Sequence, residues 1–133
     1  MRRCLLAACT TLVLGIWPAG AQLAPTPGEI AAYAGLHAAA ARGDVSEIGR
    51  LAKTGAGLDA RDSHGRTPLM VAAHRRDVAA ARALIGAGAD VNALDSQRYD
   101  IVTIAAVADD IDMLKLALAS GGNPRAVTSP YQG

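Results

Sequence analysis

The sequence predicts an all-α solenoid of about three helix-turn-helix repeats of 33 residues, joined by extended, hairpin-like loops. Two observations lead to this prediction. The chain of 133 residues resembles itself when it is shifted by 33 positions, and a fixed period of this length is typical of stacked repeats. Alanine is its commonest apolar residue, with 30 copies, and the sequence has no phenylalanine. Such a composition suits thin helices packed close together better than it suits a deep ligand cavity.

Residues 1–21 are predicted to be a secretory signal peptide. A basic start at residues 2–3 precedes an apolar run over residues 4–17, and a proline and small residues follow. The apolar run is shorter than the roughly 20 residues that cross a bilayer as a helix. We therefore expect cleavage between Ala21 and Gln22 and a periplasmic or secreted product that has no contact with the membrane.

Two other interpretations of this segment would change the localisation. Residues 6–9 resemble a lipoprotein box that would carry lipid on Cys9, but too few apolar residues precede Cys9 to form an export helix. Arg2 and Arg3 loosely resemble a twin-arginine signal, although one residue alone precedes them and such pairs are common in ordinary signals.

Removal of the signal would also remove both cysteines, Cys4 and Cys9. The mature chain would then have no disulfide, no thiol nucleophile and no thiolate metal ligand. It would carry 11 basic and 12 acidic residues, a net charge near −1. This balance gives no reason to expect nucleic acid or an anionic membrane surface as a partner.

Three copies of the repeat align without a gap. The matching positions are Leu36, Leu69 and Val102, then Ala39, Ala72 and Ala105, then Asp44, Asp77 and Asp110, then Gly55, Gly88 and Gly121. We assign residues 32–64, 65–97 and 98–130 to the three repeats, of which the third is degenerate, and residues 22–31 to a leader that serves as a spacer. Residues 131–133 are then a tail or the start of a missing fourth repeat.

The middle repeat shows how each copy is expected to fold. Thr67 caps a first helix, and Pro68 lies just inside it, where a missing N–H costs nothing. A polar turn at residues 75–77 leads to a second helix over residues 78–85. Residues 86–88 end that helix, since glycine tolerates the left-handed conformation.

An extended loop connects each copy to the next. In the middle copy it runs from Asp90 to Arg98, with the turn-forming residues Asp95 and Ser96 at its tip. The other copies depart from the pattern. The first has Ala34 and Gly35 where a Thr-Pro start is expected, and the first helix of the third copy is less regular.

Residues 65–69, 72–73 and 88–93 carry a family resemblance. Their sequences, Gly-Arg-Thr-Pro-Leu, Ala-Ala and Gly-Ala-Asp-Val-Asn-Ala, are similar to the ankyrin repeat, whose length is also 33 residues. The resemblance covers about residues 32–130 and is to the short, exported bacterial type. It implies a protein-binding module that contacts partners with its loop tips and the ends of its first helices. It also implies that His37 braces neighbouring loops by hydrogen bonds.

The positions that the repeat pattern leaves open are the predicted partner-binding residues. They are Arg61, Ser63, His64, Arg66, His74, Arg75, Leu94, Ser96, Gln97 and Tyr99. Arginine and tyrosine are typical of interface hot spots, and an acidic surface on another, exported protein would complement this set. We expect a monomer that binds such a partner. The alternative is a truncated structural remnant of a longer array, with little binding of its own.

No catalytic residue, cofactor or metal is expected. Ser63 and His64 are adjacent, which does not place a hydroxyl on an imidazole as acyl transfer requires. Near His64 and His74 the available ligands are two aspartates, Asp62 and Asp95, which is a poor basis for a zinc site. The acidic residues at 109–112 fit a solvated helix start better than a calcium loop.

The predicted cleavage site gives a direct test. We expect that the full chain, tagged at its C-terminus and expressed in bacteria that have a periplasm, accumulates there with Gln22 as its first residue. Intact-mass spectrometry and N-terminal sequencing would show this. A lipid-bearing product that begins at Cys9, or an uncleaved cytoplasmic product, would contradict it.

Overall fold

The computed structural model describes residues 23–124, and seven helices lie in this part of the chain. The described residues include no β-strand. The predicted signal peptide, its cleavage site at Ala21 and Gln22, Cys9, and residues 131–133 lie outside the described range and stay predictions. Within the range, the predicted all-α solenoid of about three repeats is confirmed.

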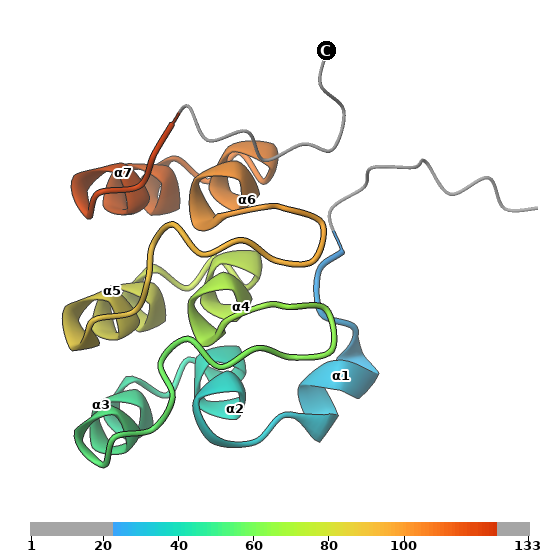
Figure 1. Ribbon diagram of the computed structural model, residues 1–133, viewed down its shortest axis with the longest axis vertical. Coiled ribbons are helices and arrows are strands. Elements are labelled where there is room, and N and C mark those ends of the chain that lie inside the picture. The colour runs from blue at the N-terminus through green and yellow to red at the C-terminus, as the bar shows by residue number, and fades with distance from the viewer. Residues whose placement is uncertain (1–22, 125–133) are drawn as a thin grey trace, which may run out of the picture.

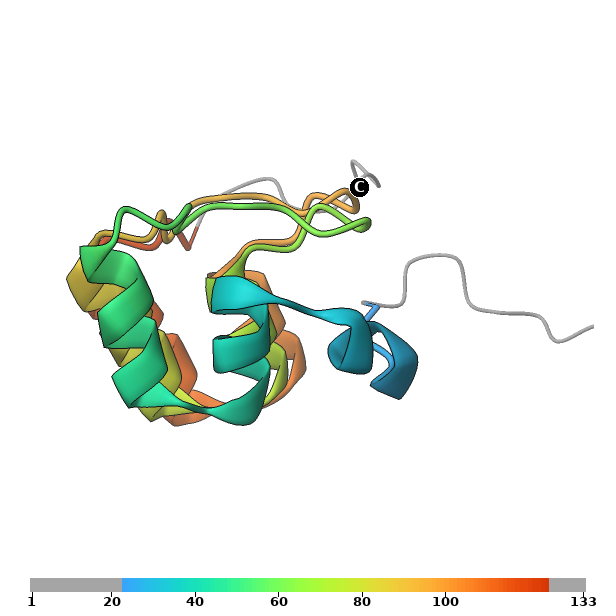
Figure 2. The same cartoon turned by 90° about the horizontal axis from the view of Figure 1, so that it is seen from below.

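Six of the helices form three stacked pairs. The pairs are α2 (Gly35–Arg42) with α3 (Val45–Lys53), α4 (Pro68–His74) with α5 (Val78–Ala87), and α6 (Ile101–Val107) with α7 (Ile111–Ala119). The first helices of the pairs stack in one column and the second helices in another (Figure 1). Long loops project from the ends of the helices to one side, beyond the column of first helices (Figure 2).

The turn between the two helices of a pair has the same conformation in all three repeats. Its middle residue is left-handed each time: Gly43 (φ 68°), Arg76 (φ 57°) and Asp109 (φ 53°). The next residue is an aspartate that caps the second helix: Asp44, Asp77 and Asp110 accept from the backbone N–H three residues on, at 3.0, 3.0 and 3.1 Å. The acidic residues at 109–112 therefore form a helix start, as expected.

The first helices begin in three different ways. Thr67 caps α4 through its hydroxyl, 3.4 Å from the Met70 N–H, and Asp100 caps α6 at 2.8 Å from the Thr103 N–H. Helix α2 begins after Ala34 without a side-chain cap. The third repeat, although degenerate in sequence, therefore keeps a complete first helix because an aspartate replaces the threonine.

Helix α5 is longer than predicted. It continues through residues 86–87 and ends at Gly88, which has a φ of 107°. The left-handed cap is thus Gly88 alone, as a positive φ suits glycine.

A single apolar cluster runs through the stack, and alanine supplies much of it. The alanines with no exposed surface are Ala39, Ala40, Ala72, Ala73, Ala80, Ala81, Ala105 and Ala117. Each second helix adds one larger side chain that is also fully buried: Ile48, Leu84 and Met113. Because alanine occupies little space, neighbouring helices approach closely, and Tyr99 is the one aromatic residue in the cluster of buried residues described.

The loops form two stacked hairpin turns, residues 62–66 and 95–99. In each turn an aspartate Oδ1 accepts two backbone N–H groups: Asp62 those of His64 and Arg66, both at 2.9 Å, and Asp95 those of Gln97 and Tyr99, at 2.8 and 2.9 Å. The turns are also joined to each other, since the Ser96 N–H and hydroxyl donate to the His64 carbonyl at 3.0 and 2.6 Å. The two tips therefore lie in register.

Alanine substitutions at two glycines should change the stability of the protein in opposite directions. Gly65 has a φ of 71°, and an added Cβ would lie 2.9 Å from the Ser96 nitrogen. Gly65→Ala should therefore lower the free energy of unfolding by about 1–2 kcal/mol or more. Gly86 lies in α5 with open space around it. Gly86→Ala should raise the free energy of unfolding by roughly 0.5–1 kcal/mol.

Urea unfolding followed by circular dichroism measures both changes. The Gly86→Ala protein is the matched control, because it receives the same methyl group. Equal effects of the two substitutions would contradict the close approach of the hairpins.

Candidate functional site

Six of the ten predicted partner-binding residues lie in the two hairpin turns, Arg61 and Leu94 lie directly before them, and the exposure of these residues differs. Arg61, Ser63 and Ser96 are exposed, as is Arg75. His64, Leu94 and Gln97 are half-buried, as is His74. Arg66 and Tyr99 are buried, with 1% and 9% of their surface exposed. His74 is the last residue of α4, and Arg75 directly follows the helix as its C-cap.

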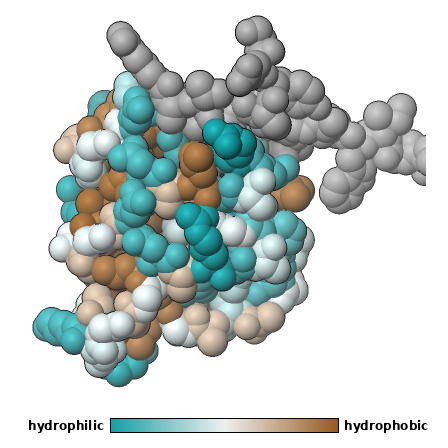
Figure 3. Space-filling model, in the orientation of Figure 1, coloured by the Kyte–Doolittle hydropathy of each residue, from teal (hydrophilic) through white to brown (hydrophobic). Residues whose placement is uncertain are grey.

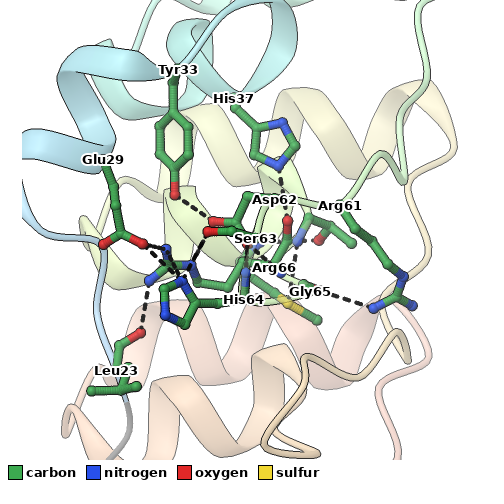
Figure 4. Close-up of polar contacts among 12 residues, drawn as sticks. Leu23, Glu29, Tyr33, His37, Arg61, Asp62, Ser63, His64, Gly65 and Arg66 are labelled. Atoms are coloured by element: carbon green, nitrogen blue, oxygen red, sulfur yellow. Dashed lines mark hydrogen bonds and ion pairs between the residues drawn. The ribbon is translucent and has the colours of Figure 1, made fainter.

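The structure corrects the position of Arg66, which was expected on the open surface. Its Nε donates to Asp62 Oδ2 at 2.7 Å, its Nη2 to Glu29 Oε1 at 2.6 Å, and its Nη1 to the Leu23 carbonyl at 3.0 Å (Figure 4). A guanidinium offers its donors in a fixed fork that suits such a cage of acceptors. Arg66 therefore ties the hairpin to the N-terminal segment of the chain.

Tyr99 occupies the same repeat position as Arg66 in the second hairpin. Its burial means that it does not present an aromatic ring to a partner in this conformation. The expectation of an exposed aromatic anchor is therefore wrong as well, because the hairpin turns this position inward in both copies.

The leader contains a helix rather than a spacer alone. Helix α1 (Pro27–Ala32) begins with a capping box: the Thr26 hydroxyl accepts from the Glu29 N–H at 3.2 Å, and the Thr26 N–H donates to Glu29 Oε2 at 2.8 Å. The helix lies beside α2, on the side to which the hairpins project (Figures 1 and 2). The capping box is visible in the sequence as Thr-Pro-Gly-Glu, so this signal was available.

Ionic hydrogen bonds dominate the contact between α1 and the first hairpin. Burial disfavours the charged form of Asp62, but hydrogen bonds from Tyr33 Oη (2.6 Å) and Arg66 outweigh it and lower its pKa to about 2. The backbone N–H of Thr26, then its hydroxyl and Arg66, lower the pKa of Glu29 to about 2 despite the opposing effect of burial. Both carboxylates are therefore charged at neutral pH.

The pKa values of Tyr33 and Arg66 are both raised, which preserves this arrangement of hydrogen bonds. Burial and the hydrogen bond to Asp62 raise the pKa of Tyr33. Burial alone would lower the pKa of Arg66, but its hydrogen bonds to Asp62 and Glu29 raise it. The phenol thus remains a donor and the guanidinium remains a cation.

The surroundings of His37 and His74 indicate structural roles for both side chains. His37 Nε2 lies 2.8 Å from the Arg66 carbonyl, so the predicted bracing of a neighbouring loop is confirmed. Burial, followed by the charge of Arg66, lowers the pKa of His74 and keeps it neutral. Within residues 23–124, no three histidine, cysteine, aspartate or glutamate side chains gather as metal ligands would.

An open hollow of about 500 Å³ lies on the column of second helices, away from the hairpins. It is lined by Val78, Arg82, Asp112, Lys115, Leu116 and Ala119. None of the predicted partner-binding residues lines this hollow. The helices described for residues 23–124 are also all too short or too polar to span a membrane.

The family model for ankyrin repeats, in three copies, matches residues 36–128. The chain belongs to the ankyrin repeat family. No curated protein matches it at a significant level. Ankyrin repeats are in general protein-protein interaction modules and are typically not enzymes. Protein binding is therefore the general function that the family and the helical stack support.

Membership in the family accounts for the hairpins but not for the docking of α1. Leu23, Glu29 and Tyr33 were not selected from the sequence, although each contacts the first hairpin. Their contacts join segments that are 29 to 43 residues apart in the chain. Glu29 and Tyr33 lie one period of 33 residues before Asp62 and Arg66, so they occupy the repeat positions that precede the first helix of the first repeat.

Replacing Arg66 should destabilise the protein strongly. Arg66→Met removes the cation from between Asp62 and Glu29 and leaves Asp62, whose side chain is 7% exposed, without its charged partner. Breaking a buried pair in this way costs about 3 kcal/mol or more. Urea unfolding at pH 7 measures the loss, and Arg75→Met, at an exposed site, should change the free energy of unfolding little.

The pH dependence of the stability lost in Arg66→Met distinguishes an ionic contribution of Arg66 from a packing contribution. Both carboxylates have folded-state pKa values of about 2, below their ordinary values of 3.8 and 4.5. Their stabilisation is therefore fully present above about pH 5 and is lost as the pH falls towards 2. The difference between wild type and Arg66→Met should shrink over this range. A difference that stays constant would contradict the ionic explanation.

Proposed function

We propose that this ankyrin protein is an exported, non-enzymatic interaction module that acts as a monomer in the periplasm. It holds another exported protein through its hairpin tips and the ends of its first helices. Family membership supports the protein-binding part, and the signal-like residues 1–21 support export.

The observation that carries the proposal is the register of the two hairpin tips. Ser63 and Ser96 are exposed at the same position of consecutive turns, and Arg61 lies exposed beside them. The Arg61 guanidinium donates to the Gly65 carbonyl at 2.9 Å and also to the Leu94 carbonyl, so it bridges both hairpins. Groups held in place before binding lose little conformational entropy on binding, which favours recognition.

The charge of this surface favours an acidic partner. Arg61 and Arg75 are both exposed. Figure 3 shows hydrophilic residues along the loops that cross the face in view, with smaller hydrophobic areas between them. Complementary charge speeds association and selects among partners more than it adds affinity.

A second candidate function is a structural array that continues beyond three repeats and binds little by itself. The third repeat favours it, since Val107, Ile111 and Leu118 are 67%, 53% and 42% exposed. A repeat stack needs a polar outer face at each end. If this candidate is right, appending a fourth repeat would raise the stability of the chain markedly, and no partner would be retained.

An affinity experiment tests the interaction module. The tagged full chain, recovered from the envelope fraction of the source cells, should retain one exported protein in a fixed ratio. Ser63→Glu and Arg75→Glu should each reduce its retention about fivefold to tenfold, since each places a negative charge before an acidic partner.

Arg82→Glu is the matched control, because it makes the same charge change on α5, in the column away from the hairpins. Equal loss with Arg75→Glu and Arg82→Glu would argue against the proposed surface. Arg66 and Tyr99 are unsuitable probes, because their burial means that substitution would disturb the hairpins themselves.

A further inference from the structure

The N-terminal segment, residues 23–32, contacts the hairpins through Leu23, in its non-helical part, and through Glu29 of α1. The Leu23 N–H donates to Gln97 Oε1 at 3.2 Å, and the Leu23 carbonyl accepts from Arg66 Nη1 at 3.0 Å. One residue is thus held by both of its backbone groups. These contacts depend on the peptide backbone, so they do not require leucine at this position.

A single carboxylate supplies the charge in this contact. Glu29 Oε1 accepts from Arg66 Nη2 at 2.6 Å and lies 2.8 Å from His64 Nδ1 (Figure 4). Arg66 has 1% of its side chain exposed, whereas Glu29 has 23%. The hairpins therefore supply a buried cation, and the N-terminal segment supplies the anion from outside.

The segment is held by few apolar contacts. Helix α1 has six residues, none of them buried, and a helix of this length is not stable by itself in water. Ile30 and Tyr33 are half-buried against the core. The chain then passes to α2 through extended residues at 33–34 and through Gly35, which has a φ of 56°. Detachment of α1 would give up these contacts and its contact with α2, but it would break no contact between the three helix pairs.

Detachment would remove two of the acceptors of Arg66. Asp62 would still accept from Nε, but Nη2 would lose a carboxylate and Nη1 would lose a carbonyl, and water would take their place. Hydrogen bonds between a guanidinium and a carboxylate are about twice as strong as those between neutral groups. The vacant site would therefore favour another segment that presents one carboxylate and one backbone carbonyl in the same arrangement.

We propose that residues 23–32 are an intramolecular ligand of the hairpin tips, and that an extended acidic segment of the partner protein displaces them and places its own carboxylate against Arg66 and His64. This inference rests on the proposed function and adds to it the chemistry of the partner and a means of regulation. The partner must compete with α1, so the chain binds weakly until a sufficiently acidic segment is present.

A peptide that copies residues 23–33 is the probe, acetylated at its N-terminus and labelled with a fluorophore. Its binding to the full chain is measured by fluorescence anisotropy. Glu29→Lys in the protein should detach α1 by repulsion from Arg66 and open the site. The peptide should therefore bind the Glu29→Lys protein about tenfold or more tighter than wild type, whose own segment occupies the site.

Two variants keep the comparison matched. Glu47→Lys reverses a charge in the first turn of α3, away from the site, and should bind the peptide as weakly as wild type. Glu29→Gln should give an intermediate affinity and also replaces Glu29→Lys if circular dichroism shows that the latter is unfolded. A peptide with glutamine in place of its glutamate should bind the opened site about tenfold more weakly.

Equal binding to wild type and to both Glu29 variants would overturn the inference, as would equal affinity of the two peptides. This outcome differs from failure of the proposed function. If the envelope experiment retains a partner through Arg75 while the peptide shows no preference for the opened site, the interaction module stands and the intramolecular ligand does not. If instead the peptide prefers the opened site but no exported protein is retained, the intramolecular ligand stands and the interaction module does not.

Discussion

The carboxylate of Asp62 holds together parts of the molecule that are far apart in the chain. Its Oδ1 accepts the backbone N–H groups of His64 and Arg66 and so closes the first hairpin. Its Oδ2 accepts from Arg66 Nε and from Tyr33 Oη. The same group therefore shapes the loop, neutralises a buried arginine and fixes the residue that follows α1. Loss of any of these contacts weakens the others, because a buried charge needs all of its partners.

The helices at the two ends of the stack, α3 and α7, differ in the side chains that they expose. The outer helix of the first repeat, α3, carries Glu47, Arg50 and Lys53, which suits a terminal face in contact with water. The outer helix of the third repeat, α7, carries Asp112 and Lys115 but also exposes Ile111 and Leu118. The position of Ile111 is held in α3 by Val45, which is 43% exposed, so the two end helices share one exposed apolar position and differ at Leu118, whose counterpart in α3 is Ala52.

The features that the sequence predicted correctly are local or periodic. Caps such as Thr67 and Asp77 depend on a backbone group three residues away, and Gly88 depends on its own φ. The burial of Arg66 was not predicted, because it depends on a contact between residues far apart in the chain. The repeat pattern leaves its position open, arginine is usually exposed, and its partner Glu29 lies 37 residues earlier, outside the repeated region. Propensity contains no information about that pairing, and the period shows only that Glu29 is the counterpart of Asp62 one repeat earlier.

The position of Arg66 couples the stability of α1 to partner binding. A ligand that binds only the form with α1 detached must supply the free energy of detachment, and its apparent affinity falls by the fraction of molecules in that form. The coupling is reciprocal, so a bound acidic segment would also keep α1 detached. Exposed residues such as Ser63 and Arg75 are outside this competition. The hairpin surface therefore combines contacts that are always available with one ionic site whose occupancy depends on the chain itself.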